Sequence, residues 1–390
     1  MSITISQQVT SVEAPPIAEA MSWVRNGPRN RTFLNLCQAV PSYPPAAELQ
    51  EEFARLAKTD GIGGYTNIYG LEALRQSHAA TMAADYSATI DASKVAITTG
   101  CNQAFAAAIL TVAQAGDTVV LPTPWYFNHQ MWLKMLGIGI QPISAFAGGH
   151  NYPDVAEAEK TITTTTRAIV LCTPNNPTGA IYPAEVIHAF FELAQRKGIA
   201  LILDETYKDF RPDAAPPHKL FQRDDWDGTL IQLYSFSKVY ALAGYRLGSM
   251  IASESLLSEA AKVLDCMTIC PPHITQAGVI YALKELGAWK RGKLDVMAGR
   301  LNAIRSAFEH ADLKFEMVSS GAYFAYVKHP FSGELSKPVA MRLAQEHDVL
   351  CLPGIMFGPG QEDYLRFAFA NVDGALMQPL VERLIGAQVS

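Results

Sequence analysis

Short apolar runs and longer amphipathic stretches alternate along the middle of the chain. The apolar runs are rich in Val, Ile and Leu, and they occupy residues 94–100, 118–124, 167–174, 199–205 and 230–235. Helical periodicity falls between them, over 101–116, near 128–137 and over 183–198. Nearly continuous apolar runs are typical of strands buried on both faces, and helices between such strands indicate parallel crossovers. The pattern predicts an α/β fold whose central sheet is doubly wound, mostly parallel and flanked by helices.

The last hundred or so residues follow a different pattern. A long helix is predicted from near Glu285 and another around 335–347, with apolar segments at 315–320, 322–328 and 364–371. A chain of 390 residues also exceeds the size at which single cores usually divide. We expect an N-terminal arm that completes part of a small domain (1–45), a large domain (46–285) and a small α+β domain at the C-terminus (286–390).

Charge and cysteine content limit the possible partners. The formal net charge is −6 without a long run of one sign, which argues against nucleic acid as a partner. The N-terminus lacks the pattern of a signal peptide, and no apolar run is long enough to span a bilayer, so we expect no membrane partner. The six cysteines form no CxxC pair and no metal-like spacing, which predicts reduced thiols, no metal and a cytoplasmic protein.

Polar and aromatic residues follow each of the five predicted strands. They are the segments GCNQ (100–103), PTPWYFNHQ (122–130), TPNNPTG (173–179), Asp204 with Tyr207, and SFSK (235–238). In a doubly wound sheet, ligands bind at the carboxyl ends of the strands. Taken singly, these residues would be a loop lysine, a helix cap, a turn and core aromatics. Their occurrence together at successive strand ends favours one site.

The chemistry of these residues indicates a phosphorylated, flat cofactor. A helix that begins after Gly100 offers free amides to a phosphate, and Arg246 adds a bidentate donor. Asp204 at the end of an apolar run needs a cationic partner. Lys238 becomes a nucleophilic amine when burial and nearby cations deprotonate it. Phosphate site, aromatic, acid and lysine together are the protein signature of pyridoxal 5′-phosphate.

With these motifs in order, the sequence resembles the class I/II aminotransferases, the aspartate aminotransferase superfamily of fold-type I pyridoxal-phosphate enzymes. NNPTG (175–179), DETY (204–207) and SFSK (235–238) followed by Arg246 carry the resemblance, which covers about residues 30–385. It implies the fold-type I architecture, in which a large cofactor-binding domain with a mostly parallel sheet is joined to a smaller α+β domain.

The resemblance also implies a role for individual residues. Lys238 would form the Schiff base and shuttle the proton at the substrate Cα, while Asp204 would keep the pyridine nitrogen protonated. Asn176 and Tyr207 would hydrogen-bond the phenolic oxygen of the cofactor, and Tyr126, or less favourably Trp125, would stack on its ring. The phosphate would be held by the amides of Cys101 and Asn102 together with Ser235, Ser237 and Arg246.

Three further positions concern the substrate and the neighbouring subunit. Arg366 matches the family arginine that binds the substrate α-carboxylate. Tyr65, in YTNIYG, matches the tyrosine that reaches the phosphate of a neighbouring subunit, which implies a homodimer. Ala39 stands where relatives usually have a glycine against the substrate, and its methyl group would trim that pocket.

The function implied is an aminotransferase that moves an amino group between an L-amino acid and a 2-oxo acid by a ping-pong mechanism. A pyridoxal-phosphate lyase, synthase or oxidase on the same scaffold is the alternative. A non-catalytic regulatory domain is disfavoured, because the roughly 30 residues before the family region are too few for a helix-turn-helix module. The aromatic residues Tyr126, Phe127, Tyr323 and Phe357 favour an apolar or aromatic substrate, unless they belong to the core.

Overall fold

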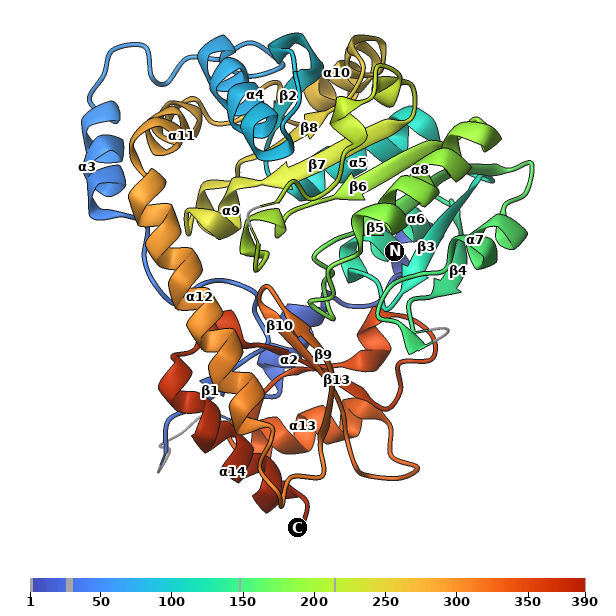
Figure 1. Cartoon of the computed structure of the whole chain (residues 1–390), viewed down its shortest axis with the longest axis vertical. Coiled ribbons are helices and arrows are strands. Elements are labelled where there is room, and N and C mark those ends of the chain that lie inside the picture. The colour runs from blue at the N-terminus through green and yellow to red at the C-terminus, as the bar shows by residue number, and fades with distance from the viewer. Residues whose placement is uncertain (1–2, 26–30, 147–148, 214, 390) are drawn as a thin grey trace.

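The computed structural model describes residues 3–25, 31–146, 149–213 and 215–389. Its upper part in Figure 1 is a seven-stranded sheet with helices on both faces, and its lower part holds a smaller antiparallel sheet. The long helix α12 (Gly287–Ala307) runs from one part to the other. The predicted α/β architecture is confirmed.

The large sheet has the strand order β2-β8-β7-β6-β5-β3-β4. Its strands are β2 (Val95–Thr98), β3 (Thr118–Thr123), β4 (Gly139–Ser144), β5 (Thr166–Cys172), β6 (Ala200–Asp204), β7 (Leu230–Ser235) and β8 (Gly248–Ile251). All are parallel except β8, which runs antiparallel to both β2 and β7. The five predicted strands are therefore present.

Two strands of this sheet were not predicted, β4 and β8. β4 is an edge strand of sequence GIQPIS whose Pro142 interrupts any apolar run, and a proline in a run argues against a strand unless the strand lies at a sheet edge. β8 has only the four residues GSMI, so its pattern is too short to recognise. β8 lies between β2 and β7. The carboxyl end of β2 is therefore separated from the carboxyl end of β7 by the width of one strand.

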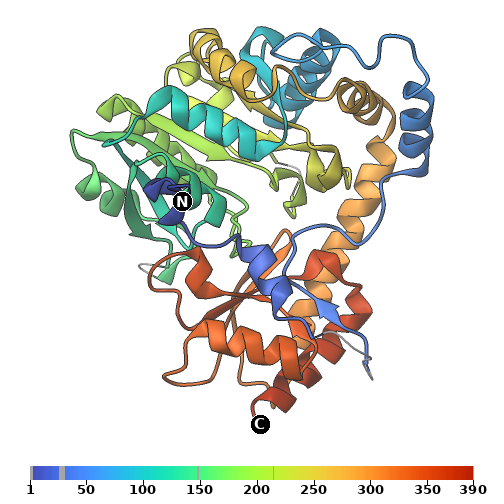
Figure 2. The ribbon, with the colours of Figure 1, turned by 180° about the vertical axis from the view of Figure 1, so that it is seen from behind.

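Two hydrophobic clusters cover the faces of the large sheet, because successive strand residues point to opposite sides. In β5, Ile169 and Leu171 pack in one cluster, and Ala168 and Val170 pack in the other. The first face is covered by α3 (Ala47–Leu56), α4 (Glu72–Tyr86), α7 (Val155–Thr161), α8 (Ala184–Lys197) and α11 (His273–Glu285). The second is covered by α5 (Cys101–Val112), α6 (Phe127–Met135) and α10 (Glu254–Thr268), of which α5 is seen in front of the sheet in Figure 2.

The smaller part is built around a four-stranded antiparallel sheet of order β12-β13-β10-β9. Its elements are β9 (Glu316–Gly321), β10 (Phe324–Lys328), α13 (Ser336–Glu346), β12 (Leu352–Pro353), β13 (Tyr364–Ala368) and α14 (Met377–Ala387). β1 (Leu34–Asn35) pairs in parallel with β11 (Val349–Leu350), so a segment from the start of the chain is joined to the C-terminal part. The helix predicted from near Glu285 begins at Gly287.

The N-terminal arm lies across both parts of the molecule. α1 (Gln7–Thr10) packs against α6, and α2 (Pro16–Ser22) lies beside the smaller part, as the dark blue ribbon in Figure 2 shows. The two parts also meet directly at Gly179 of the NNPTG segment, where an added Cβ would lie 2.4 Å from the carbonyl oxygen of Gly321. Only glycine permits that approach, and the φ of Gly179 is +72°.

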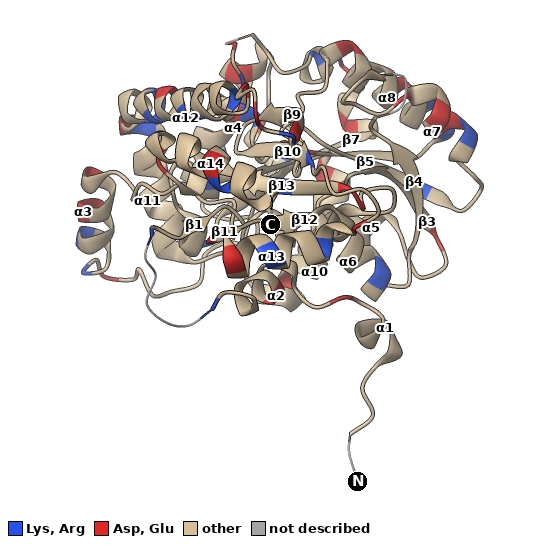
Figure 3. Ribbon diagram, turned by 90° about the horizontal axis from the view of Figure 1, so that it is seen from below, with Lys and Arg blue, Asp and Glu red and all other residues tan. Residues whose placement is uncertain are grey.

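The surface carries both signs of charge. Figure 3 shows Lys and Arg interspersed with Asp and Glu over the ribbon seen from below, consistent with the formal net charge of −6. Over the part of the chain that the structure describes, no helix combines the length and the hydropathy needed to cross a bilayer.

Candidate active site

A pocket lies at the carboxyl ends of β5, β6 and β7 and beside the start of α5. It is lined by Cys101, Asn102, Tyr126, Cys172, Asn176, Asp204, Thr206, Tyr207, Ser235, Ser237, Lys238 and Arg246. Ten of these twelve residues were predicted as site residues from the sequence, and Cys172 and Thr206 were not. The structure thus brings together side chains from five separate segments.

The start of α5 forms one end of the pocket. Gly100 precedes the helix with φ +81°, and no side chain caps the first turn. A Cβ at Gly100 would lie 2.4 Å from Nη2 of Arg246, so only glycine leaves room for that guanidinium. Ser235 and Ser237 are buried at the neighbouring end of β7, where the hydroxyl of Ser235 accepts a hydrogen bond from the Ser237 amide. Backbone amides, hydroxyl groups and a guanidinium therefore line the same end of the pocket.

Asp204 is buried at the end of β6, and its carboxylate has partners on both oxygens. Oδ2 lies 3.2 Å from Nε2 of His129. Oδ1 accepts a hydrogen bond from the amide of Thr206 at 3.0 Å and lies 3.6 Å from the Sγ of Cys101. Burial alone would raise the pKa of Asp204, but the hydrogen bonds from His129 and Thr206 hold it below its usual value. The carboxylate is thus kept ionised in a buried position.

The partner of Asp204 was expected to be cationic, and among the described residues it is His129 rather than a Lys or Arg. His129 is buried on α6, and its ring stacks on Phe105 of α5 with centroids 4.1 Å apart. Sequence reasoning did not single it out. No local signal identifies it, because its role depends on the contact between α6 and the end of β6, two segments far apart in the sequence.

Lys238 follows β7 in the short helix α9 (Phe236–Val239), and its ammonium group faces the pocket. Nζ donates a hydrogen bond to the carbonyl oxygen of Ala39 at 2.7 Å, and the Tyr323 hydroxyl donates to the Lys238 carbonyl at 3.0 Å. No carboxylate forms an ion pair with Lys238 in the described chain. Burial and the positive charges of Arg366 and Arg246 lower the pKa of Lys238 to about 8.

Arg366 of β13 is a buried guanidinium, 1% exposed, that no carboxylate neutralises among the described residues. Nη1 donates to Oδ1 of Asn176 at 2.9 Å, and Nη2 donates to the carbonyl oxygen of Cys37. Nε has no hydrogen-bond partner. The guanidinium lies 5.2 Å and 5.1 Å from the ring centroids of Phe324 and Phe357. Because buried charges are normally paired, this arrangement points to an anionic ligand.

The aromatic candidates separate into one that lines the pocket and others that do not. Tyr126 lines it and accepts a hydrogen bond from Asn128 at 3.0 Å, whereas Trp125 lines a different cavity. Tyr323 and Phe357 are fully buried in the core, so they give no support to an aromatic substrate. Phe127 lines the same second cavity as Trp125.

Three predicted positions are not among the residues that line the pocket within one chain: Tyr65, Ala39 and Arg366. Tyr65 is 79% exposed, Ala39 contacts Lys238 through its backbone carbonyl, and Arg366 reaches the lining through its bond to Asn176. Tyr207 is buried against Tyr323 and Phe324, and the Lys238 ammonium lies 5.7 Å from the centroid of the Tyr207 ring.

Over the described residues, no group of three or more His, Cys, Asp and Glu side chains could hold a metal ion.

Comparison with known proteins identifies aminotransferases as relatives over most of the chain. Residues 31–384 match the family model "Aminotransferase class I and II". An aromatic aminotransferase of Arabidopsis thaliana, ISS1, is 29% identical over 358 residues, which are 90% of this chain and 88% of that protein. An aspartate aminotransferase of Sulfurisphaera tokodaii is 27% identical over 355 residues, 87% of this chain and 86% of the relative.

Solved structures share the fold. An aspartate aminotransferase from Thermus thermophilus with maleate has a TM-score of 0.88 at 20% identity and covers 99% of this chain and 100% of its own. An aromatic aminotransferase from Pyrococcus horikoshii has a TM-score of 0.85 at 22% identity, covering 96% and 98%. These comparisons do not favour a lyase, synthase or oxidase. The chain belongs to the class I and II aminotransferase family, and its activity is amino-group transfer.

Proposed function

We propose that this chain binds pyridoxal 5′-phosphate in the pocket at the ends of β5, β6 and β7 and transfers an amino group between an L-amino acid and a 2-oxo acid. One observation carries the proposal. Lys238 lines the pocket and the buried Arg366 binds the lining residue Asn176, and neither cation has a carboxylate partner in the described chain. Cations so placed suit an enzyme that attaches a cofactor through an amine and binds a substrate carboxylate.

The donor groups present fit the phosphate of this cofactor. The uncapped start of α5 supplies the amides of Cys101 and Asn102, and Ser235 and Ser237 supply hydroxyls. The guanidinium of Arg246 lies against Gly100, and a side chain at position 100 would displace this guanidinium. Backbone amides at a helix start and a guanidinium are the preferred partners of a phosphate. These groups would hold the phosphate end of the cofactor.

The acidic and aromatic residues fit the ring. When bound, pyridoxal phosphate supplies an aldehyde that joins the substrate nitrogen and a protonated ring that takes up the electron pair released at Cα. Asp204, ionised by its bonds from His129 and Thr206, would hold the proton on the ring nitrogen. Tyr126 would stack on the ring, and Asn176 and Tyr207 would hydrogen-bond its phenolic oxygen.

Lys238 and Arg366 would act on the substrate. With a pKa of about 8, about a tenth of Lys238 is the free amine at pH 7, far more than for an ordinary lysine, and this amine would take a proton from the substrate Cα and return it elsewhere. Arg366 would bind the α-carboxylate in a bidentate manner, and its unpartnered Nε is available for that contact. Binding would exchange the carbonyl of Cys37 for the carboxylate, because both compete for the same guanidinium.

A homodimer and a cytoplasmic location belong to the same proposal. Tyr65 is an exposed aromatic side chain, 79% accessible in the single chain, which suits a residue that contacts a neighbouring subunit. The cysteines are free thiols, in keeping with a reducing compartment. Cross-linking or sedimentation of the purified protein, and the activity of Tyr65→Ala, would test the dimer and its contribution to the site.

The first test is the visible spectrum of the purified protein with a panel of single L-amino acids. Because the relatives include an aromatic and an aspartate aminotransferase, the panel should contain aromatic, acidic and aliphatic members. We expect the yellow band of the bound cofactor to bleach with a matching amino acid and to return with a 2-oxo acid. Release of ammonia, pyruvate or peroxide instead would support the lyase or oxidase alternative, and no band after addition of cofactor would refute the proposal.

A further inference from the structure

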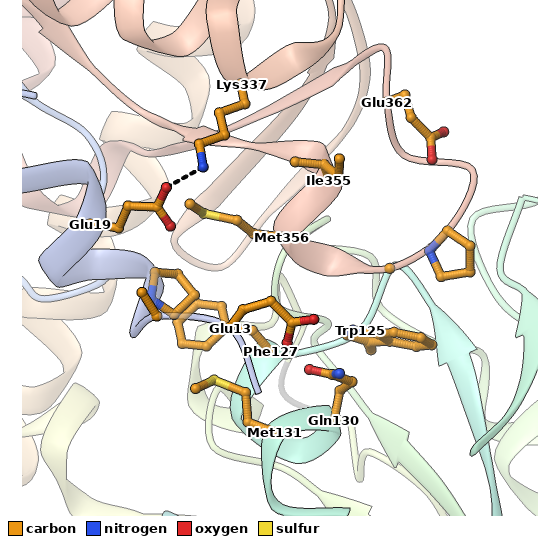
Figure 4. Close-up of a pocket in the computed structure, with 14 residues that line it drawn as sticks. Glu13, Glu19, Trp125, Phe127, Gln130, Met131, Lys337, Ile355, Met356 and Glu362 are labelled. Atoms are coloured by element: carbon orange, nitrogen blue, oxygen red, sulfur yellow. Dashed lines mark ion pairs between the residues drawn. The ribbon is translucent and has the colours of Figure 1, made fainter. Parts of the chain in front are cut away.

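A second cavity, separate from the cofactor pocket, lies where the N-terminal arm crosses between the two parts of the molecule. We call it the arm pocket. It has a volume of about 430 Å³, within the range of small-molecule sites. The lining residues are Glu13, Ala14, Pro16, Glu19, Trp125, Phe127, Gln130, Met131, Lys337, Ile355, Met356, Gly358, Pro359 and Glu362. Figure 4 shows most of these side chains converging on one space from three ribbons.

The walls of the arm pocket are apolar and deformable. Trp125 and Phe127 supply aromatic surfaces, and Met131, Ile355 and Met356 supply aliphatic and thioether surfaces. Methionine side chains adapt to irregular ligands and interact favourably with aromatic rings. The pocket therefore suits a molecule with an apolar body about the size of one ring.

The polar groups at its rim are mainly acidic. Glu13 forms an ion pair with Lys134 at 2.9 Å, and Glu19 forms one with Lys337. Glu362 makes no ion pair with any described residue, and its carboxylate accepts only the amide of Gly360, at 3.3 Å. Glu13 and Glu19 thus have lysine partners, and Glu362 is the lining carboxylate that lacks one among the described residues, so a cation is the complementary charge there.

A layer of aromatic residues divides this cavity from the cofactor pocket. Tyr126 lines the cofactor pocket, and the next residue, Phe127, lines the arm pocket. Phe127 contacts the buried ring of Phe357 at a centroid distance of 5.9 Å, and Arg366 lies on Phe357. The backbone is fixed here as well, because the amide of Trp125 donates to the carbonyl of Phe357 at 2.9 Å.

We propose that the arm pocket is a second ligand site, which binds a small molecule that has a ring-sized apolar body and an ammonium group. The apolar body would lie against Trp125, Phe127 and Met356, and the ammonium group would pair with Glu362. Such a ligand contacts the arm, the large sheet part and the smaller part at once. It would therefore stabilise their present arrangement by mass action, with no contact to Lys238.

The experiment uses the holoenzyme after borohydride reduction, which fixes the cofactor and prevents amines from reacting with it. The probe is 2-phenylethylamine, titrated by calorimetry, with 2-phenylethanol as an uncharged probe of similar size that offers no carboxylate to Arg366. We expect one saturable site per chain for the amine and weaker binding of the alcohol. Absence of amine binding, or equal binding of both probes, would overturn the proposal.

Two variants locate the binding to the arm pocket. Ile355 is 43% exposed, so Ile355→Trp narrows the pocket without burying new volume in the core, and it should abolish binding. Glu362→Gln should weaken it roughly two- to fivefold, as expected for one partly exposed ion pair. Glu316→Gln, an exposed acid elsewhere on the smaller part, is the matched control and should leave binding unchanged.

Steady-state kinetics separate a second site from a substrate subsite. In the proposed arrangement, Ile355→Trp leaves the ratio of kcat/KM values for aromatic and acidic amino acids unchanged. If the variant selectively raises KM for large apolar amino acids, the cavity holds the substrate side chain, and the assignment as a separate site is wrong. Amine binding that survives Ile355→Trp with unchanged affinity would place the ligand elsewhere and would equally contradict it.

Discussion

Two lysines, Lys208 buried and Lys238 partly buried, follow neighbouring strands of the large sheet, and their surroundings are opposite. Lys208 comes after β6, and its ammonium pairs with Asp85 and Asp209, the latter at 3.5 Å. Burial alone would lower the pKa of Lys208, but these carboxylates raise it. Lys238 comes after β7 with no carboxylate partner in the described chain, and burial and two arginines lower its pKa to about 8.

The counter-ions explain this difference. Asp209 also accepts hydrogen bonds from Lys290 of α12 and from the Tyr234 hydroxyl, the latter at 2.6 Å. We call Lys208, Asp85, Asp209, Lys290 and Tyr234 the Lys208 cluster. It joins the segment after β6 to β7 and to the long helix α12. A buried lysine with paired charges holds elements together, whereas one without them is reactive.

Replacing Lys238 should have the largest effect. We expect Lys238→Ala to lower kcat/KM by roughly 10²–10⁴-fold through loss of proton transfer alone, because no other amine faces the pocket among the described residues. Steady-state kinetics with saturating cofactor would measure this. Near-normal turnover would assign the chemistry to another group. Lys208→Met, judged on soluble holoenzyme, should keep much more of the activity.

Breaking the Lys208 cluster should reduce stability rather than turnover. Asp209→Asn leaves the buried Lys208 and the partly buried Lys290 with one fewer carboxylate, and we expect a loss of about 3–5 kcal/mol in the free energy of unfolding. In the folded protein the pKa of Asp209 is lowered and the pKa of Lys208 is raised. The variant and the natural protein should therefore differ in free energy of unfolding at any pH between the pKa of an unfolded Asp and the pKa of an unfolded Lys. This difference should disappear as the solution becomes strongly acidic.

Urea unfolding measures this loss. The matched control is Asp213→Asn, an exposed acid paired with Arg211, which should change the free energy of unfolding by less than about 0.5 kcal/mol. If Asp209→Asn were as stable as this control but had a lower catalytic rate, the Lys208 cluster would serve catalysis rather than stability, contrary to our account.

Arg366→Leu should remove substrate recognition. Loss of a bidentate charge-assisted contact is worth about 3 kcal/mol, or roughly 10²-fold in kcat/KM. The selectivity for an amino acid over the amine that lacks the carboxylate should fall by a similar factor, which competition kinetics would measure. Unchanged selectivity would mean that Arg366 is structural.

The same variant should change the pH dependence of cofactor attachment. Arg366 lowers the pKa of Lys238, so attachment of added cofactor to the apoprotein should accelerate as the pH rises through about 8. In Arg366→Leu the midpoint should move to higher pH, because one repelling charge is gone. The rate of appearance of the visible band measures both profiles, and identical midpoints would contradict this account of Lys238.

The smallest effect is expected at Cys101, whose Sγ lies 3.6 Å from the Asp204 carboxylate. Cys101→Ala removes one weak donor, which is worth about 1 kcal/mol, or about fivefold in kcat. Cys101→Ser should restore most of that loss with little change in KM. The exposed Cys266 provides a control substitution without effect, and equal rates in the Ala and Ser variants would show that the thiol only fills space.

The sequence predicted the site more completely than it predicted the sheet. Residues of the site stand directly after buried strands, so Asp204 and Lys238 were recognisable from local pattern and family motifs. β4 and β8 were missed because one contains Pro142 and the other has four residues. His129 and the pairing of Lys208 depend on contacts between distant elements, which no local pattern records.

The most direct test of the contrast between the two lysines is chemical. The purified protein is loaded with pyridoxal phosphate, reduced with borohydride and digested, and the modified lysine is identified by peptide mass mapping. Our account predicts a single adduct on Lys238, with Lys208 unmodified, because only the unpaired lysine presents a free amine to the pocket. An adduct on Lys208, or on another lysine in place of Lys238, would contradict it.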